Sequence, residues 1–260
     1  MNLDTLAARI RDARRLTILT GAGVSAASGV PTFRGPQGLW RRYRPEDLAT
    51  PEAFARDPQL VWEWYAWRRE MIAACRPNAA HEVIAQWSQG VRPRNEPSPG
   101  SDPGTGRVKV AVLTQNVDDL HVRAGTQHLV RLHGSIWELS CWAGCATGAA
   151  PWREERVPLP EVPPRCPHCG QLARPALVWF GESLDQRDVN AALEATACDV
   201  FLTVGTSSLV YPAAGFVHQA RERGAFTAEV NPDETPASSL VDLAIRGPAE
   251  EMLPLLHERL

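Results

Sequence analysis

Four of the six cysteines occur in two closely spaced pairs, a spacing typical of a metal site. Cys166 and Cys169 form the knuckle CPHC, followed by a glycine, and Cys141 and Cys145 form CWAGC a short segment earlier. Four thiolates bind one zinc ion tetrahedrally and leave no open coordination position, so such an ion would be structural. We therefore predict a zinc site with these four ligands; four unliganded thiols are the alternative.

Tyr65 and Arg68 form a second pair whose residue types and spacing indicate a binding role. They lie three residues apart in WYAWRRE, within a tryptophan-rich segment of helical character, so both side chains share one helix face. A phenol beside a guanidinium group can hold a carboxylate by charge-assisted hydrogen bonds. The pair therefore suggests a site for an anion, whereas a structural or surface ion pair is the alternative for Arg68 alone.

The elements that must position these residues are short apolar strands separated by helices. Residues 3–14 have helical periodicity, and β-branched runs follow in RLTILTGAG, VKVAVLTQN, DVFLTVGTSS and, more weakly, GAFTAEVN. Such strands predict a parallel sheet covered on both faces. The predicted fold class is α/β, with a Rossmann-like parallel sheet domain and a smaller inserted domain made of a zinc ribbon and a helical module.

Two insertions interrupt the predicted sheet. The first, residues 38–107, holds the tryptophan-rich helical module and the stretch RPRNEPSPGSDPGTG, whose proline and glycine content predicts an exposed loop. The second, residues 136–174, carries the cysteine pairs. We assign residues 1–37, 108–135 and 175–260 to the Rossmann-like domain.

Composition excludes some classes of function. The net charge is -3 and the isoelectric point is about 6.2, which argues against binding to nucleic acid or anionic membrane through charge alone. No apolar run approaches the roughly 20 residues of a membrane span. The N-terminal segment lacks the pattern of a signal peptide, so we expect an ordinary first helix and a cytoplasmic protein. Nothing in the sequence predicts an oligomer.

The stretch GAGVSAASGVPTFRG, residues 21–35, follows the first predicted strand at the edge where open α/β sheets bind ligands. Gly21 and Gly23 would let the backbone approach a pyrophosphate closely. Ala26 replaces the third glycine of the GxGxxG pattern, so a plain turn into a helix is the alternative. The further glycines, Phe33 and Arg34 favour a loop that folds over a ligand.

The chain resembles the sirtuin family of NAD-dependent protein-lysine deacylases. The resemblance covers almost the whole chain and rests on GAGVSAASGVPTFRG, TQNVDDLH, LHGS, the two cysteine pairs, VWFGE and GTSS, in the order and at about the spacing of the family. It implies the same fold that the strands and cysteines predict. It also implies that NAD is consumed as a co-substrate and is not used for hydride transfer.

The resemblance implies a cofactor site along residues 21–35 and at the strand ends. Phe33 would lie near the nicotinamide end, Gln115 and Asn116 would meet the nicotinamide ribose, and Asp118 would accept a hydrogen bond from the carboxamide. Thr32 stands where many members have aspartate, which leaves less negative charge. The implied cofactor residues are Gly21, Ala22, Gly23, Ser25, Thr32, Phe33, Arg34, Gln115, Asn116, Asp118, Gly205, Thr206, Ser207, Asn231 and Ala249.

The implied catalytic residues are His133 of LHGS, as general base, and Asn116. In the family's reaction the acyl oxygen of the substrate displaces nicotinamide, and the acyl group ends on the ribose. An imidazole with a pKa near neutrality suits the base. A lone histidine near a strand end would otherwise be a hydrogen-bonded core residue.

The resemblance also implies that the substrate peptide binds as an extended strand between VWFGESL and the segment at Val210. Tyr65 and Arg68 match the Y-x-x-R signature of the sirtuin branch that removes succinyl, malonyl and glutaryl groups, and Ala49 stands where that branch widens its pocket. The implied substrate-binding residues are Ala49, Tyr65, Arg68, Val178, Phe180, Gly181, Glu182, Val210 and Tyr211.

Two other functions remain open. A mono-ADP-ribosyltransferase would use the same NAD pocket, although His133 together with VWFGE favours deacylation. A non-catalytic, NAD-sensing zinc-ribbon module would need no general base, so His133 and Asn116 count against it.

Overall fold

The computed structural model describes residues 2–33, 38–39, 44–91 and 107–260. Arg34 and the stretch RPRNEPSPGSDPGTG lie outside these residues, so both predictions made for them stay predictions. The helices are α1 (Asn2–Asp12), η1 (Ala22–Ser28), α2 (Pro45–Leu48), α3 (Pro51–Arg56), α4 (Pro58–Ala74), α5 (Ala79–Ser88), α6 (Leu120–Arg123), α7 (Gln186–Ala195), η3 (Ala213–Gly215), α8 (Phe216–Glu222) and α9 (Ala249–His257), where η marks a 3-10 helix. The strands are β1 (Arg15–Thr20), β2 (Lys109–Thr114), β3 (Leu129–Arg131), β4 (Gly134–Cys141), β5 (Trp152–Arg153), β6 (Ala173–Leu177), β7 (Val200–Val204), β8 (Phe226–Asn231) and β9 (Leu243–Arg246).

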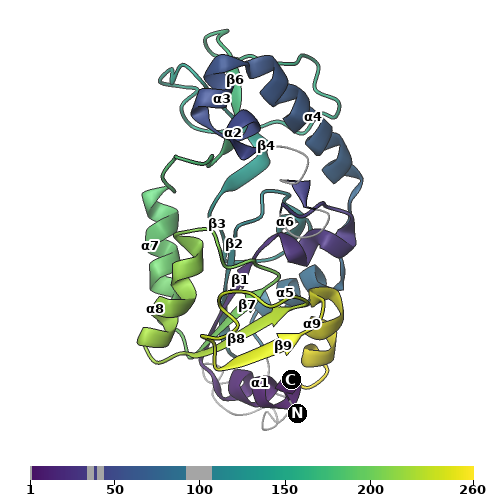
Figure 1. The fold of residues 1–260 in the computed structure, drawn as a ribbon, viewed down its shortest axis with the longest axis vertical. Helices are drawn as coiled ribbons and strands as arrows, with labels where there is room; N and C mark the ends of the chain where they lie inside the picture. Colours follow the sequence, from purple (N-terminus) through teal and green to yellow (C-terminus); the bar gives the residue numbers. More distant parts are fainter. Residues whose placement is uncertain (1, 34–37, 40–43, 92–106) are drawn as a thin grey trace, which may run out of the picture.

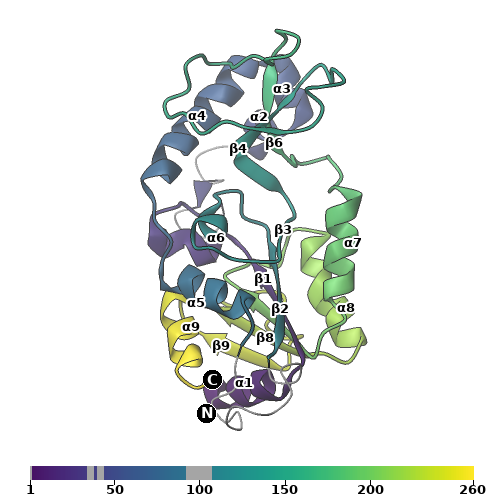
Figure 2. The ribbon, with the colours of Figure 1, turned by 180° about the vertical axis from the view of Figure 1, so that it is seen from behind.

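A six-stranded parallel sheet in the order β3-β2-β1-β7-β8-β9 forms the larger lobe. Helices α1, α5 and α9 cover one face and share a core with Leu16 and Ile18 of β1, while α7 and α8 cover the other face around Leu19 (Figures 1 and 2). Buried side chains on both faces explain why the central strands are apolar runs without alternation. The predicted α/β class is confirmed; the edge strands β3 and β9 were not predicted.

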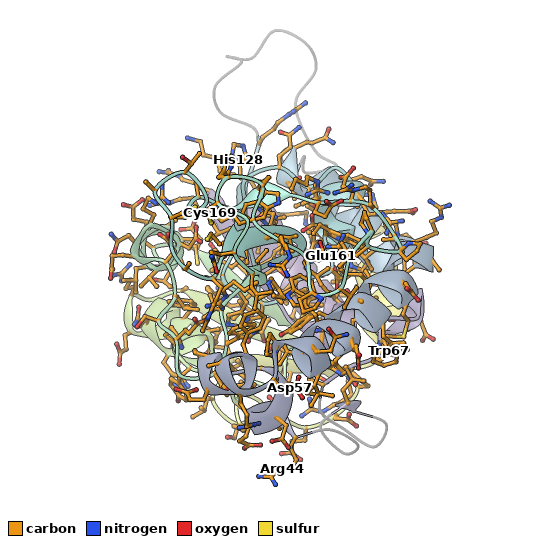
Figure 3. The ribbon with its side chains drawn as sticks, turned by 90° about the horizontal axis from the view of Figure 1, so that it is seen from above. Arg44, Asp57, Trp67, His128, Glu161 and Cys169 are labelled. Carbon is orange, nitrogen blue, oxygen red and sulfur yellow. The ribbon has the colours of Figure 1, made fainter. Side chains whose placement is uncertain are left out.

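The smaller lobe packs α2, α3 and α4 against an antiparallel sheet in the order β5-β4-β6 (Figure 1). In the view from above, α4, with Asp57 at its N-cap and Trp67 within it, lies apart from the predicted zinc ligand Cys169 (Figure 3). The indole of Trp62 ties the helix to the sheet, because its Nε1 donates to the Ala173 carbonyl at 2.8 Å. The division of the chain at the predicted domain boundaries stays a prediction.

Helix α4 carries the predicted anion site, and local signals define its ends. The Asp57 carboxylate caps it by accepting from the Leu60 amide at 2.9 Å, and Pro58 occupies the first turn, where no amide donor is needed. The helix ends at Ala74, shortly before Pro77.

No helix among the described residues is long and apolar enough to cross a membrane.

Candidate active site

A cavity of about 910 Å³ lies between the lobes, at the carboxyl ends of β1, β2, β7 and β8. It brings together most of the residues predicted from sequence. Those lining it are Gly21, Ala22, Gly23, Thr32, Phe33, Ala49, Tyr65, Arg68, Gln115, Asn116, His133, Val178, Phe180, Gly181, Glu182, Gly205, Thr206, Ser207, Val210, Tyr211, Asn231 and Ala249. Ser25 and Asp118 are buried behind its wall.

Backbone runs directly against backbone where the glycine-rich stretch meets the end of β7. Gly23 donates its amide to the Gly205 carbonyl at 2.8 Å, and a Cβ atom on Gly23 would lie 2.7 Å from that oxygen. Only glycine fits there. Gly23 already belongs to η1, so the structure differs from the loop predicted to start at Gly21. The irregular segment begins after Gly29, whose φ of 91° ends the 3-10 helix.

A buried polar network centred on Ser25 supports the floor of the cavity. The Ser25 hydroxyl accepts from Asn116 Nδ2 at 3.1 Å and donates to Asp118 Oδ2 at 2.8 Å, and His81 Nε2 lies 3.3 Å away. The Leu120 amide donates to the other Asp118 oxygen at 2.9 Å. Asn116 is thereby fixed, and Asp118, which does not line the cavity, contacts Ser25 behind its wall.

Burial shifts the pKa of each ionisable group in and below this network. It raises the pKa of Asp118, although the bonds from Leu120 and Ser25 oppose this. Burial lowers the pKa of His81 to about 4 and that of the neighbouring His121 to about 3. These imidazoles are therefore neutral at pH 7. The centres of the two rings lie 4.9 Å apart.

A second network crosses the cavity between β2, β7 and β8. Gln115 Nε2 donates to Thr206 Oγ1 at 2.9 Å, and Asn231 Nδ2 donates to the Thr206 carbonyl at 2.8 Å. The buried carboxylate of Glu229 supports the segment after Asn231. It accepts hydrogen bonds from the hydroxyls of Thr235 and Ser238. The sequence prediction missed Glu229, although an acid within the apolar run of GAFTAEVN was a signal.

Among the described residues, the Gln115 carbonyl is the hydrogen-bond partner that orients His133. Its Nδ1 lies 3.0 Å from the Gln115 carbonyl oxygen, which can only accept, so Nδ1 carries the proton and Nε2 is the free acceptor. Burial lowers the pKa of His133, and this carbonyl bond partly opposes the shift. The neutral ring has the tautomer that a general base at Nε2 requires.

The strand that follows His133 is joined to the loop that carries Asn116 and Asp118. The Ile136 amide donates to the Val117 carbonyl at 2.9 Å, and Ser135 Oγ donates to Asp119 at 2.8 Å. Asp119 also pairs with Arg131 at 3.4 Å and with Arg153 at 2.9 Å. Because Arg153 belongs to β5, this buried carboxylate links the loop of Asn116 and Asp118 to the small sheet; the sequence prediction missed it.

Tyr65 and Arg68 lie together at the end of the cavity formed by the smaller lobe, as their spacing predicts. Both are buried, and burial lowers the pKa of Arg68 and raises that of Tyr65 to about 12. The guanidinium carbon of Arg68 lies 4.7 Å from the Phe33 ring centre and 4.9 Å from that of Trp64. Among the described residues no carboxylate lies within ion-pair distance of Arg68, although the charge of the buried Asp118 partly opposes the lowering of its pKa. The guanidinium group lines the cavity.

The segment VWFGE forms a tight turn beside this end of the cavity. The Glu182 amide donates to the Trp179 carbonyl at 3.0 Å, and Gly181 at the third position has a φ of 86° that favours glycine. The Phe180 amide donates to the Ala49 carbonyl at 3.0 Å, and the Val178 amide to the His133 carbonyl at 3.2 Å. The turn therefore joins His133 to the cavity wall at Ala49.

The four predicted zinc ligands come together away from the cavity, with their sulfur atoms all within 4.8 Å of one another. The Sγ atoms of Cys141 and Cys169 lie 3.5 Å apart, and those of Cys145 and Cys166 lie 3.7 Å apart. Four sulfurs about 2.3 Å from a tetrahedral zinc ion would lie about 3.8 Å apart. The cluster therefore fits one structural zinc ion.

Comparisons with known proteins agree with this geometry. The model of the family described as "Sir2 family" matches residues 21–95 and 104–212. The chain is 48% identical to an NAD-dependent protein deacylase of Pyrobaculum aerophilum, over 99% of this chain and 94% of that protein, and 44% identical to one of Aquifex aeolicus, over 94% and 95%. A crystal structure of a Sir2 homologue in complex with NAD superposes with a TM-score of 0.84 at 41% identity, covering 98% of this chain and 92% of that one. The glycine-rich stretch, the histidine-bearing cavity and the four-cysteine cluster thus have a common explanation: the chain belongs to the Sir2 family.

Proposed function

We propose that this NAD-dependent protein deacylase acts on lysine side chains that carry acidic acyl groups, namely succinyl, malonyl and glutaryl, and that it removes acetyl groups more slowly. The products would be nicotinamide, the free lysine and 2'-O-acyl-ADP-ribose. The deacylase activity follows from membership of the family, whereas the preference for acidic groups is our inference from the pocket.

One observation carries this preference. Arg68 is 3% exposed and lines the cavity without an ion-pair partner among the described residues. A buried guanidinium group costs free energy unless it is paired, so the protein would keep it there for an anion that arrives with the substrate. An acetyl group has no charge to offer. A carboxylate at the tip of the acyl chain could accept from both Arg68 and Tyr65.

The remaining residues suit deacylation. NAD, when bound, would supply the ribose carbon that the acyl oxygen attacks and the hydroxyl that receives the acyl group. The backbone at Gly21, Gly23 and Gly205 would hold its phosphates, and Asn116, fixed by Ser25, would orient the ribose. His133 would take the hydroxyl proton at Nε2 while the Gln115 carbonyl holds Nδ1.

The substrate peptide would lie across the mouth of the cavity. Phe180 and Tyr211 are 42% and 72% exposed there, on the two segments proposed to flank an added strand. Recognition through backbone hydrogen bonds would tolerate many peptide sequences, so selectivity would come mainly from the acyl pocket.

The test is a side-by-side assay of one peptide carrying acetyl, succinyl, malonyl or glutaryl lysine, with and without NAD. We expect NAD-dependent removal of all groups that fit, with kcat/KM higher for succinyl and malonyl than for acetyl. A higher kcat/KM for acetyl would refute the acidic preference. Transfer of ADP-ribose to protein without deacylation would instead indicate a mono-ADP-ribosyltransferase.

A further inference from the structure

The indole of Trp179 forms a hydrogen bond inside the acyl pocket. Its Nε1 lies 2.9 Å from the Tyr65 hydroxyl oxygen, and both side chains are buried, at 3% and 2% exposure. An indole N–H can only donate, so the phenol oxygen is the acceptor of this bond. Among the described residues the Tyr65 hydroxyl has no other hydrogen-bond partner, and its own hydrogen is left for a group in the cavity.

The turn around Trp179 fixes the indole in this position. The Arg174 guanidinium lies 3.7 Å from the indole ring centre and binds Glu182 through two bonds, of 2.5 and 2.8 Å. Glu182 in turn accepts from the Trp179 amide at 2.8 Å. Arg174 thus forms an ion pair with Glu182, whereas Arg68 forms none with any residue that the structure describes and feels Asp118 only through its charge. Trp179 therefore contacts the ion pair of Arg174 and Glu182 and also the Tyr65 hydroxyl of the pocket.

We propose that Trp179 is a specificity-determining positioning residue, which holds the Tyr65 hydroxyl as a hydrogen-bond donor toward the acyl group. Arg68 can only donate, and Trp179 holds Tyr65 as a donor, so this pair of side chains presents donors to the acyl group. It therefore favours an acyl tip that only accepts, which a carboxylate does. A hydrogen bond received by the phenol oxygen also strengthens the bond that its hydrogen donates. This inference rests on the proposed preference for acidic acyl groups.

The test is a double-mutant cycle of Trp179→Phe and Tyr65→Phe, scored by the ratio of kcat/KM for succinyl to acetyl peptide. Trp179→Phe keeps an aromatic ring and removes the N–H. One neutral hydrogen bond corresponds to about 2- to 10-fold, so we expect the ratio to fall by that factor, mainly through KM for succinyl peptide. In the Tyr65→Phe background the same change should have little further effect on the ratio.

Trp142→Phe is the matched control, because Trp142 also lies near Arg174, at 5.9 Å, and packs 6.5 Å from the Trp179 ring. Trp142 is 37% exposed and does not line the cavity, so its variant should keep the wild-type ratio. If Trp179→Phe does not fold, replacing Trp179 by 3-benzothienylalanine removes only the N–H and keeps the shape of the indole.

The outcomes separate the two claims. Equal losses on succinyl and acetyl peptides, or a Trp179 effect on the ratio that adds fully to that of Tyr65→Phe, would overturn the role of Trp179. If Arg68→Met lowers the ratio while both Trp179 variants leave it unchanged, this inference alone fails. If the wild-type protein shows no preference for succinyl and Arg68→Met changes nothing, the proposed function fails as well.

Discussion

Arg68 and Arg69 are consecutive residues of α4 and both are buried, yet their guanidinium groups have opposite surroundings. Arg69 donates to the carbonyls of Ile136 at 2.6 Å and Glu154 at 2.5 Å, and its guanidinium carbon lies 4.8 Å from the centre of the Trp137 ring. Among the described residues Arg68 has aromatic neighbours but no such acceptor. Arg69 thus braces the fold, whereas Arg68 lines the cavity, where we propose that it binds the acyl group.

Arg69→Met should therefore destabilise the protein without changing its acyl selectivity. The variant leaves the carbonyls of Ile136, Glu154 and Arg156 without their charged donor, and hydrogen bonds to charged groups contribute roughly 1.5–3 kcal/mol each. We expect a clear loss in the free energy of unfolding, measured by denaturant titration, and an unchanged succinyl-to-acetyl ratio. An altered ratio at wild-type stability would contradict this assignment.

His133→Ala should abolish most turnover while the fold is kept. Loss of a general base costs about 10²- to 10⁴-fold in rate, and His133→Tyr should behave in the same way. The check is kcat on the best acyl peptide, with circular dichroism to show a folded variant. Near-normal turnover in folded His133→Ala would remove this residue from the mechanism.

The pH dependence of wild-type activity is an independent test of the proposed role of His133. A base acts only when it is neutral, and the lowered pKa of His133 keeps it neutral below its ordinary value of 6.5. The acid limb of kcat/KM should therefore fall below pH 6.5, and an acid limb clearly above that value would contradict the assignment.

The zinc site should support stability as well as activity, because four thiolates that meet at one point would repel one another without the metal. Cys166→Ser or a strong chelator should lower the melting temperature and, with it, turnover. Cys198→Ser is a suitable control, since Cys198 lies outside the cluster. A stable, active protein with substoichiometric zinc would contradict a structural role.

Acid should destabilise the protein through His81 and His121. Their pKa values, about 4 and about 3 when folded, lie below the ordinary 6.5 of an unfolded histidine, so between these values the unfolded chain binds protons that the folded chain does not. Stability should thus fall as pH drops below about 6.5, by roughly 1.4 kcal/mol per pH unit for each group. Unfolding free energies measured from pH 7 to 5 check this.

The control for this prediction is a histidine exposed to solvent. His121→Asn should flatten the pH dependence, whereas His128→Asn should leave it unchanged, because His128 is exposed and asparagine tolerates its positive φ of 51°. A wild-type stability that stays flat from pH 7 to 5 would show that the two imidazoles are not buried in their neutral form.

The sequence predicts those parts of the molecule whose signals are local. The apolar runs predict the central strands. The two closely spaced pairs Cys141, Cys145 and Cys166, Cys169 predict one cluster, because two such pairs are typical of a single zinc site. Strand β3 is only three residues long and β9 only four, too short for a clear pattern.

Contacts between distant segments carry no such signal. Trp179 and Tyr65 lie 114 residues apart, and only the folded chain shows their hydrogen bond. Spacing alone also cannot choose between the two arginines, since Arg68 and Arg69 are three and four residues beyond Tyr65 and either could share its face. The folded structure distinguishes the two arginines, because Arg69 donates to the carbonyls of Ile136 and Glu154.

The central claim is that Arg68 binds the carboxylate of the acyl group, and the most direct measurement is kcat/KM of Arg68→Met on succinyl and acetyl versions of one peptide. Methionine keeps much of the bulk and removes the charge. We predict about a 10- to 150-fold loss for succinyl peptide, carried mainly by KM, with acetyl activity unchanged or somewhat improved. Equal losses on both peptides, accompanied by a lower melting temperature, would contradict the claim and make Arg68 a second structural brace beside Arg69.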